Sequence, residues 1–113
     1  MQREYRVYLD DIIESIDRIE KYTKGISYEE FSSGSIYIDA VARNLEIIGE
    51  AVKSLPSEMK QKHPEIEWKK IAGLRDILIH EYFGIDSRII WDIIANKLPD
   101  LKNSVKKILI ELD

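Results

Sequence analysis

Cysteine is absent from this chain of 113 residues, and glycine, proline and histidine are sparse. The lack of cysteine excludes disulfides and thiolate metal sites. The five glycines form no phosphate-binding loop, no dinucleotide fingerprint and no nucleophile elbow of the Gly-x-Ser-x-Gly type. The purely apolar runs are only a few residues long, which is far too short to span a membrane. Most cofactor-binding, disulfide-rich and membrane classes are therefore excluded.

Histidine occurs only at His63 and His80. Neither belongs to a Glu-x-x-His pair, so the carboxylate-bridged di-iron motif of helical bundles is missing. His63 precedes Pro64 in an expected surface turn, and we interpret it as a solvated residue. We therefore predict neither a metal site nor a cofactor.

Hydrophobic residues make up 44% of the chain and charged residues 34%, which is typical of a soluble globular protein. The length predicts one domain, residues 1–113. A net charge of −4 argues against non-specific coating of nucleic acid but allows a small local anion site. The first residues and the acidic, amphipathic segment after them do not resemble a signal peptide, so we expect a cytoplasmic protein.

Apolar residues recur with helical periodicity along the chain, and no strand-like alternation rivals them. The expected helices cover approximately residues 9–23, 35–55, 67–82, 87–98 and 101–112, with one short helical turn within 27–34. These segments predict an all-α fold, an antiparallel bundle of about five helices.

The expected helix ends carry recognisable signals. Gly25 is a natural C-terminal stop for the first helix. Ser27 begins a capping-box pattern that ends at Glu30. Asp86 or Ser87 can cap a later helix, and Pro99 is expected to kink or restart it.

Isoleucine is abundant, although it is a mediocre helix former, so packing must hold the helices together. Several isoleucines come in tandem pairs that broaden the apolar faces. Ile89, Ile90, Ile93, Ile94 and Leu98 are expected to point inward. The broad faces are consistent either with a helix-mediated dimer or with a wider core.

Arg75 falls in the middle of an apolar helical face that Trp68, Ile71, Ala72, Leu78, Ile79 and Tyr82 are spaced to share. A guanidinium cannot lose its charge, so burying it without a partner is expensive. The expected partner is an acidic neighbour, another subunit or an anionic substrate.

A polar stripe on the 35–55 helix, formed by Asp39, Arg43, Glu46 and Glu50, could hold a ligand. The favoured interpretation is a salt-bridged face or an internal partner for Arg75. A modest positive excess from Lys60, Lys62, Lys69 and Lys70 near Arg75 is explained equally by steering of RNA phosphate and by a solvated face.

Arg75 and His80 are chemically sufficient to cleave RNA without a metal, because RNA carries its own nucleophile, the 2′-hydroxyl. Neutral His80 can accept the hydroxyl proton, and Arg75 can stabilise charge on the phosphoryl oxygens. Asp76 lies one turn before His80 and can orient the imidazole. Arg75 and His80 diverge by about 140° on an ideal helix, so they converge only if the helix loosens or the site spans a dimer.

Three blocks in this order resemble one known family. Residues 43–51, RNLEIIGEA, resemble the family's second characteristic helix, and residues 64–74, PEIEWKKIAGL, resemble the lead-in to its motif. Arg75-Asp76-Ile77-Leu78-Ile79-His80-Glu81-Tyr82 resembles the HEPN motif in its HepT-like form. Residues 82–86 and 90–92 resemble the family's segments on the C-terminal side of the motif, so the likeness covers most of the chain.

The resemblance implies a homodimeric, metal-independent endoribonuclease that is the toxin of a prokaryotic type II toxin–antitoxin system. It implies Arg75 and His80 as the catalytic pair and Asp76 as the supporting polar residue. It also implies an MNT-type nucleotidyltransferase antitoxin that modifies Tyr82 with adenylate, which would repel RNA. One position departs from the pattern, because asparagine is frequent where Asp76 stands, and a carboxylate there repels phosphate.

Two other classes remain open. One is a non-catalytic helical module that partners a nucleotidyltransferase or binds a nucleotide, which the acidic net charge and Asp76 favour. The other is a purely structural bundle dimer in which Arg75 pairs with Glu46 or Glu50.

Overall fold

The structure, a computed structural model, describes residues 2–33, 35–80 and 86–112, without the side chains of residues 2–4, 35 and 77–80. All regular structure in these residues is helical. The long helices are α1 (Gln2–Thr23), α3 (Ser35–Ser54), α5 (Trp68–His80) and α7 (Leu98–Leu112), and the short ones are α2 (Tyr28–Ser33), α4 (Ser57–Gln61), α6 (Ser87–Asp92) and the π-helical η2 (Ile93–Lys97). The prediction of an all-α bundle is confirmed.

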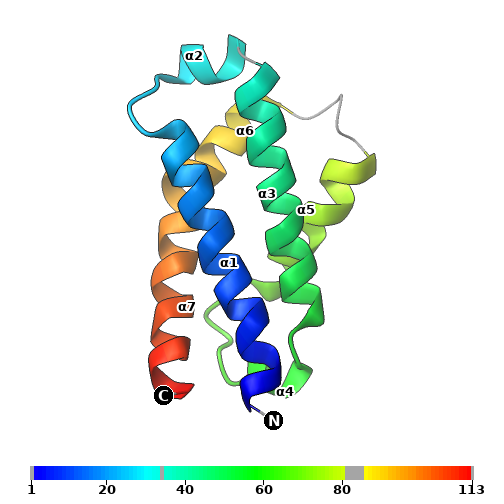
Figure 1. The fold of residues 1–113 in the computed structure, drawn as a ribbon. Helices are drawn as coiled ribbons and strands as arrows, with labels where there is room; N and C mark the ends of the chain where they lie inside the picture. Colours follow the sequence, from blue (N-terminus) through cyan, green and yellow to red (C-terminus); the bar gives the residue numbers. More distant parts are fainter. Residues whose placement is uncertain (1, 34, 81–85, 113) are drawn as a thin grey trace.

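Helix α3 is the centre of the bundle (Figure 1). It packs against α1 and against α5, and α1 also packs against α7. The two chain ends lie at one end of the bundle, near α4, whereas α2 crosses the opposite end (Figure 1). Helix α5, which carries the sequence motif, is therefore positioned mainly by α3.

The expected apolar stripes form one core. Its fully buried side chains include Leu9, Ile12, Ile16 and Ile19 of α1, Val41, Ile48 and Val52 of α3, and Val105 of α7. Ile89 is an exception, because it is 60% exposed while its neighbour Ile90 is buried. Successive helical residues point about 100° apart, so a narrow contact admits only one residue of the pair. The expectation that Ile89 points inward was wrong.

The helix-end signals are confirmed where the structure describes them. Gly25 has a positive φ of 79°, which suits a residue without a Cβ just after α1. The Ser27 hydroxyl accepts a hydrogen bond from the Glu30 amide at 3.1 Å. The Asp86 carboxylate accepts from the Arg88 amide at 2.9 Å and also pairs with the Arg88 guanidinium. Hydrogen bonds from Arg88 lower the pKa of Asp86.

Pro99 lies in the first turn of α7, immediately after η2. Proline has no amide hydrogen and its ring crowds the carbonyl four residues earlier, which here belongs to Ala95. The wider π-turn over residues 93–97 accommodates this missing hydrogen bond without ending the helical path. Pro99 was predicted to kink or restart the helix, and the structure places the change from π-helix to α-helix at Leu98, one residue before it.

The segment before α5 is fixed by one indole. Trp68 Nε1 donates to the carbonyls of Lys60 at 3.1 Å and His63 at 3.0 Å. This turn brings His63 between Glu65 and Glu111, at 3.6 and 3.9 Å from its ring nitrogens. The His63 side chain is only 17% exposed, so the interpretation of a solvated histidine was wrong. The turn packs against the end of α7, which local sequence does not reveal.

Candidate active site

Arg75 leaves the apolar face of α5 and meets an acidic residue of α3. Its Nε lies 2.5 Å from the Glu50 carboxylate, and its Nη1 lies 3.3 Å from Asp76. The Arg75 side chain remains 36% exposed, so its charge is shared between these carboxylates and solvent. Of the two acidic partners predicted for Arg75, Glu46 and Glu50, the structure pairs it with Glu50, which explains how the charge is tolerated on this face.

Gly49 lets Arg75 approach α3. A Cβ built on Gly49 would lie 3.0 Å from both the Cβ and the backbone nitrogen of Arg75, and 3.2 Å from the Ile71 carbonyl oxygen. These distances are shorter than ordinary van der Waals contacts of about 3.5–4.0 Å. The absence of a side chain at Gly49 therefore sets the spacing of α3 and α5 at the arginine.

A cleft of about 420 Å³ opens beside this ion pair. Helix α3 contributes most of its lining, α1 contributes Tyr8 and Asp11, and α5 contributes Arg75. The full lining is Tyr8, Asp11, Arg43, Glu46, Ile47, Glu50, Ala51, Ser54 and Arg75. The volume lies within the range of ligand-binding pockets.

The cleft collects most of the polar stripe predicted on α3. Arg43 pairs with Glu46 at 3.6 Å and is 72% exposed, which makes this a loose surface pair. Glu50 completes the acidic side of the stripe by holding Arg75. Asp39 is exposed and does not line the cleft. The arrangement presents guanidinium groups from two helices to one cavity.

Asp76 is 56% exposed and touches two cations. Besides Arg75, it approaches Lys53 of α3 at 3.9 Å. Asp76 therefore bridges α5 to α3 at the edge of the cleft. Its predicted contact with His80 involves a side chain outside the described residues and stays a prediction.

His80 is the last residue of α5, and its backbone is helical. Its side chain, and Tyr82 entirely, lie outside the described residues. The convergence of Arg75 with His80, and the role of Tyr82, therefore stay predictions. The regular α-helix from Trp68 to His80 contains no break between Arg75 and His80.

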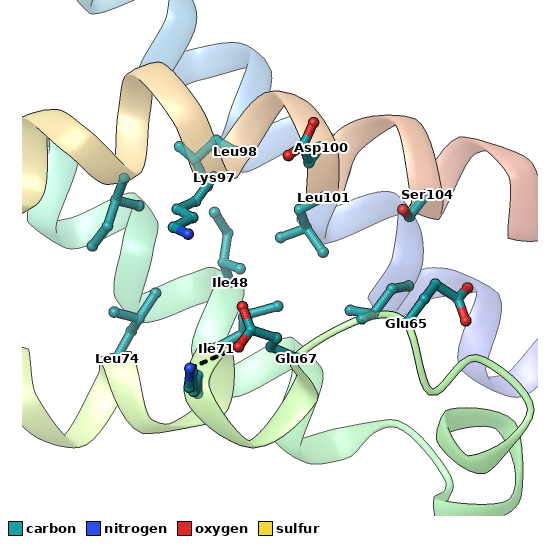
Figure 2. Close-up of a pocket in the computed structure, with 13 residues that line it drawn as sticks. Ile48, Glu65, Glu67, Ile71, Leu74, Lys97, Leu98, Asp100, Leu101 and Ser104 are labelled. Carbon is teal, nitrogen blue, oxygen red and sulfur yellow. Dashed lines mark ion pairs between the residues drawn. The ribbon is translucent and has the colours of Figure 1, made fainter.

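A second hollow, of about 340 Å³, lies on another side of α5, between this helix and the segment formed by η2 and α7 (Figure 2). Its floor is apolar and includes Ile48, Ile71 and Leu101. Its rim carries the Glu67–Lys70 ion pair of 2.7 Å, and the Lys70 hydrogen bond lowers the pKa of Glu67 (Figure 2). Neither Arg75 nor Asp76 lines this hollow.

Two of the predicted lysines are engaged by neighbouring groups in the structure. Lys60 donates to the Val52 carbonyl at 3.2 Å near the end of α3, whereas Lys70 pairs with Glu67. Among these lysines, none lines the cleft that contains Arg75.

In the part of the chain that the structure describes, no group of three or more histidine or acidic side chains is arranged to hold a metal ion. None of the described helices is both long and apolar enough to span a bilayer.

Sequence reasoning missed three polar residues of the cleft, Tyr8, Asp11 and Ser54. Tyr8 and Asp11 are one turn apart on α1, so they share a face beside its buried stripe. Nothing in the local sequence states which helix this face meets. Their place beside Arg75 follows from the packing of α1 on α3.

The fold and this arginine-bearing cleft together define an all-α, HEPN-like bundle. The family model described as Ribonuclease HepT-like matches residues 12–108, and the chain belongs to the HepT-like family.

Curated relatives agree with this membership. A putative RNase of Caldanaerobacter subterraneus subsp. tengcongensis is 49% identical over 104 residues, or 92% of this chain and 93% of the relative. A probable ribonuclease HepT of Thermococcus cleftensis is 44% identical over 108 residues, or 96% of this chain and 98% of the relative. A Methanocaldococcus jannaschii protein named gamma-glutamylcyclotransferase and putative RNase is 44% identical over 113 residues, but the chain spans only 51% of its length. No solved structure matches the chain. Family membership and these names support ribonuclease activity.

Proposed function

We propose that this protein is a metal-independent endoribonuclease whose catalytic residues are Arg75 and His80. The observation that carries the proposal is the placement of Arg75, whose partly exposed guanidinium lies in a cleft and is held by Glu50. Such a fixed cation can stabilise a phosphoryl group in its transition state. The ribonuclease family that the chain matches supports the same chemistry.

The reaction needs only groups that RNA and the protein supply. The RNA 2′-oxygen attacks the adjacent phosphorus while neutral His80 accepts the hydroxyl proton. The bond from phosphorus to the 5′-oxygen breaks, and a protonated histidine gives that oxygen a proton. The products are a 2′,3′-cyclic phosphate and a 5′-hydroxyl. Glu50 keeps hold of Arg75 Nε, so that the terminal guanidinium nitrogens can reach the phosphoryl oxygens, and Asp76 orients His80.

A homodimer is part of the proposal. On a regular helix, Arg75 and His80 point about 140° apart, and α5 is regular between them. A cleft shared by two subunits can place the histidine of one subunit near the arginine of the other.

We also propose that the protein is the toxin of a prokaryotic toxin–antitoxin system in the cytoplasm. Its antitoxin would be an MNT-type nucleotidyltransferase that transfers adenylate to Tyr82. Tyr82 follows the motif histidine by two residues, so the added phosphate would bring negative charge close to the catalytic histidine. That charge repels RNA and switches the toxin off.

The test replaces each catalytic residue and compares it with a matched residue elsewhere. Arg75→Ala and His80→Ala should each abolish RNA cleavage and growth inhibition while the protein stays folded by circular dichroism. Arg18→Gln and His63→Gln are the controls, because both residues lie outside the cleft. Full activity in either alanine variant contradicts the proposal.

A second candidate function is a non-catalytic module that partners the nucleotidyltransferase. The acidic residues of the cleft favour it, since Asp11, Glu46 and Glu50 all line the cavity. Adenylylation of Tyr82 in a protein that cleaves no RNA would support this candidate over the ribonuclease.

A further inference from the structure

Tyr8 faces the same cleft as two arginines. It lies on α1, while Arg43 comes from α3 and Arg75 from α5. The catalytic proposal uses only Arg75. An aromatic ring beside guanidinium groups is the combination with which proteins bind unpaired nucleotides, because every base has a face on which a ring can stack.

We propose that this cleft is an RNA-binding subsite in which Tyr8 stacks on one unpaired base and Arg43 binds a neighbouring backbone phosphate. The proposal rests on the proposed ribonuclease function, since it supplies the position of the strand next to Arg75. It assigns roles to two residues outside the sequence motif. The cavity of about 420 Å³ has the size of a pocket for one small ligand or one nucleotide.

Arg43 is available to a phosphate. The ion pair between Arg43 and Glu46 is long, at 3.6 Å, and the Arg43 side chain is 72% exposed. Exposed ion pairs of this kind contribute little to stability, so a phosphate can replace Glu46 as the partner of Arg43 at a small cost in free energy. Arg43 precedes Glu50 by seven residues, or about 10.5 Å along α3. Since Glu50 holds Arg75, the two guanidinium groups occupy successive positions along the cleft.

The acidic lining favours an unpaired base over a paired one. Asp11 lies one helical turn from Tyr8, and Glu46 and Glu50 line the adjacent wall. Carboxylates repel phosphate but accept hydrogen bonds from the N–H groups on base edges. In a duplex those edges are already paired, and the base faces are covered by stacking. The cleft therefore selects single-stranded RNA.

The binding test uses 2′-O-methyl RNA, which lacks the nucleophile and stays intact, as a labelled single strand and as a duplex. Fluorescence anisotropy at several salt concentrations gives affinity and its salt dependence. The wild-type protein should prefer the single strand. Tyr8→Leu should weaken single-strand binding by about 5- to 100-fold, while Tyr8→Phe keeps it. Arg43→Gln should lower the magnitude of the log–log salt slope for the single strand by about 0.7.

Matched controls come from α1. Tyr22→Leu removes an exposed tyrosine outside the cleft, and Arg18→Gln removes an exposed arginine that is also ion-paired. Both should bind like the wild type. Because Arg43 is exposed, its variant tests the subsite even if Tyr8→Leu fails to fold.

Cleavage of unmodified RNA, measured in parallel, separates the two proposals. Cleavage with unaltered single-strand binding in the Tyr8→Leu and Arg43→Gln variants overturns the subsite and leaves the ribonuclease standing. Tyr8-dependent binding without cleavage supports the subsite and overturns the ribonuclease. Equal affinity for single strand and duplex, or no RNA binding, overturns the subsite.

Discussion

Gly49→Ala should push α5 away from α3 at the candidate active site. The new methyl carbon would lie 3.0 Å from Arg75 Cβ and from its backbone nitrogen. Ordinary contact needs about 3.5–4.0 Å, so one helix must move by roughly 0.5–1 Å. The contact atoms on α5 are backbone or next to it, so rotating a side chain cannot relieve the clash.

The stability effect has two opposing parts. Replacing glycine by alanine within a helix stabilises it by about 0.8–1.0 kcal/mol. Forcing an extra methyl into a tight contact costs about 1–3 kcal/mol. Gly73 of α5 is the matched control, because a Cβ there meets nothing within 4 Å. Both variants gain the same helix stabilisation from alanine, and only Gly49→Ala suffers the clash. Gly49→Ala should therefore be less stable than Gly73→Ala by about 1–3 kcal/mol.

Urea denaturation followed by circular dichroism measures the free energies of unfolding of both variants. Cleavage assays then report the position of Arg75, because a displacement of about 1 Å can lower activity as much as 100-fold. We expect Gly49→Ala to lose at least about tenfold in kcat/KM. Equal stability of the two alanine variants, with full activity at Gly49→Ala, would refute the close approach of α3 and α5.

Three further substitutions test individual contacts. Glu50→Gln should lower kcat, because Arg75 loses the charge that orients it. It should not raise KM for RNA, because the cleft also loses an anion. An unchanged kcat in steady-state kinetics would contradict this role of Glu50. Trp68→Phe should reduce the free energy of unfolding by about 1–2 kcal/mol, since two carbonyls lose the indole donor; a loss below about 0.5 kcal/mol in urea would count against that anchor. Lys102→Met should lower the free energy of unfolding by roughly 0.5–1 kcal/mol at pH 7. Lys102 of α7 pairs with two acidic residues of α1, Asp17 at 2.7 Å and Glu20 at 3.2 Å. The hydrogen bond to Asp17 raises the pKa of Lys102 above its ordinary value of 10.5. The stabilisation by these ion pairs is therefore complete below that value and disappears as pH rises through the folded-state pKa. A stability difference between wild type and Lys102→Met that stays constant to high pH would disprove the ion pairs.

Local signals predicted the helices well because each acts over a few residues. The Gly25 stop, the Ser27 cap and the Asp86 cap all depend on side chains or backbone freedom at the helix end itself. Apolar periodicity likewise predicted the buried faces of α1 and α3. These features need no knowledge of which helices meet.

The composition of the cleft was only partly predictable. Glu50 was among the expected partners of Arg75, since a buried-face arginine needs an acid and the polar stripe offered few. Arg75 pairs with Glu50 and not with Glu46, and Tyr8 lines the cleft, because of the way α1, α3 and α5 pack together. The same reason explains the wrong expectations for His63 and Ile89, whose environments are set by distant segments.

We propose that Arg75 and His80 cleave RNA through its own 2′-hydroxyl. The most direct measurement incubates purified protein with RNA in EDTA and identifies the new ends by mass spectrometry. We expect 2′,3′-cyclic phosphate and 5′-hydroxyl ends, with no cleavage where a single 2′-deoxy nucleotide replaces the attacking residue. Cleavage that persists at the 2′-deoxy position, or that leaves 5′-phosphate ends, would contradict the account.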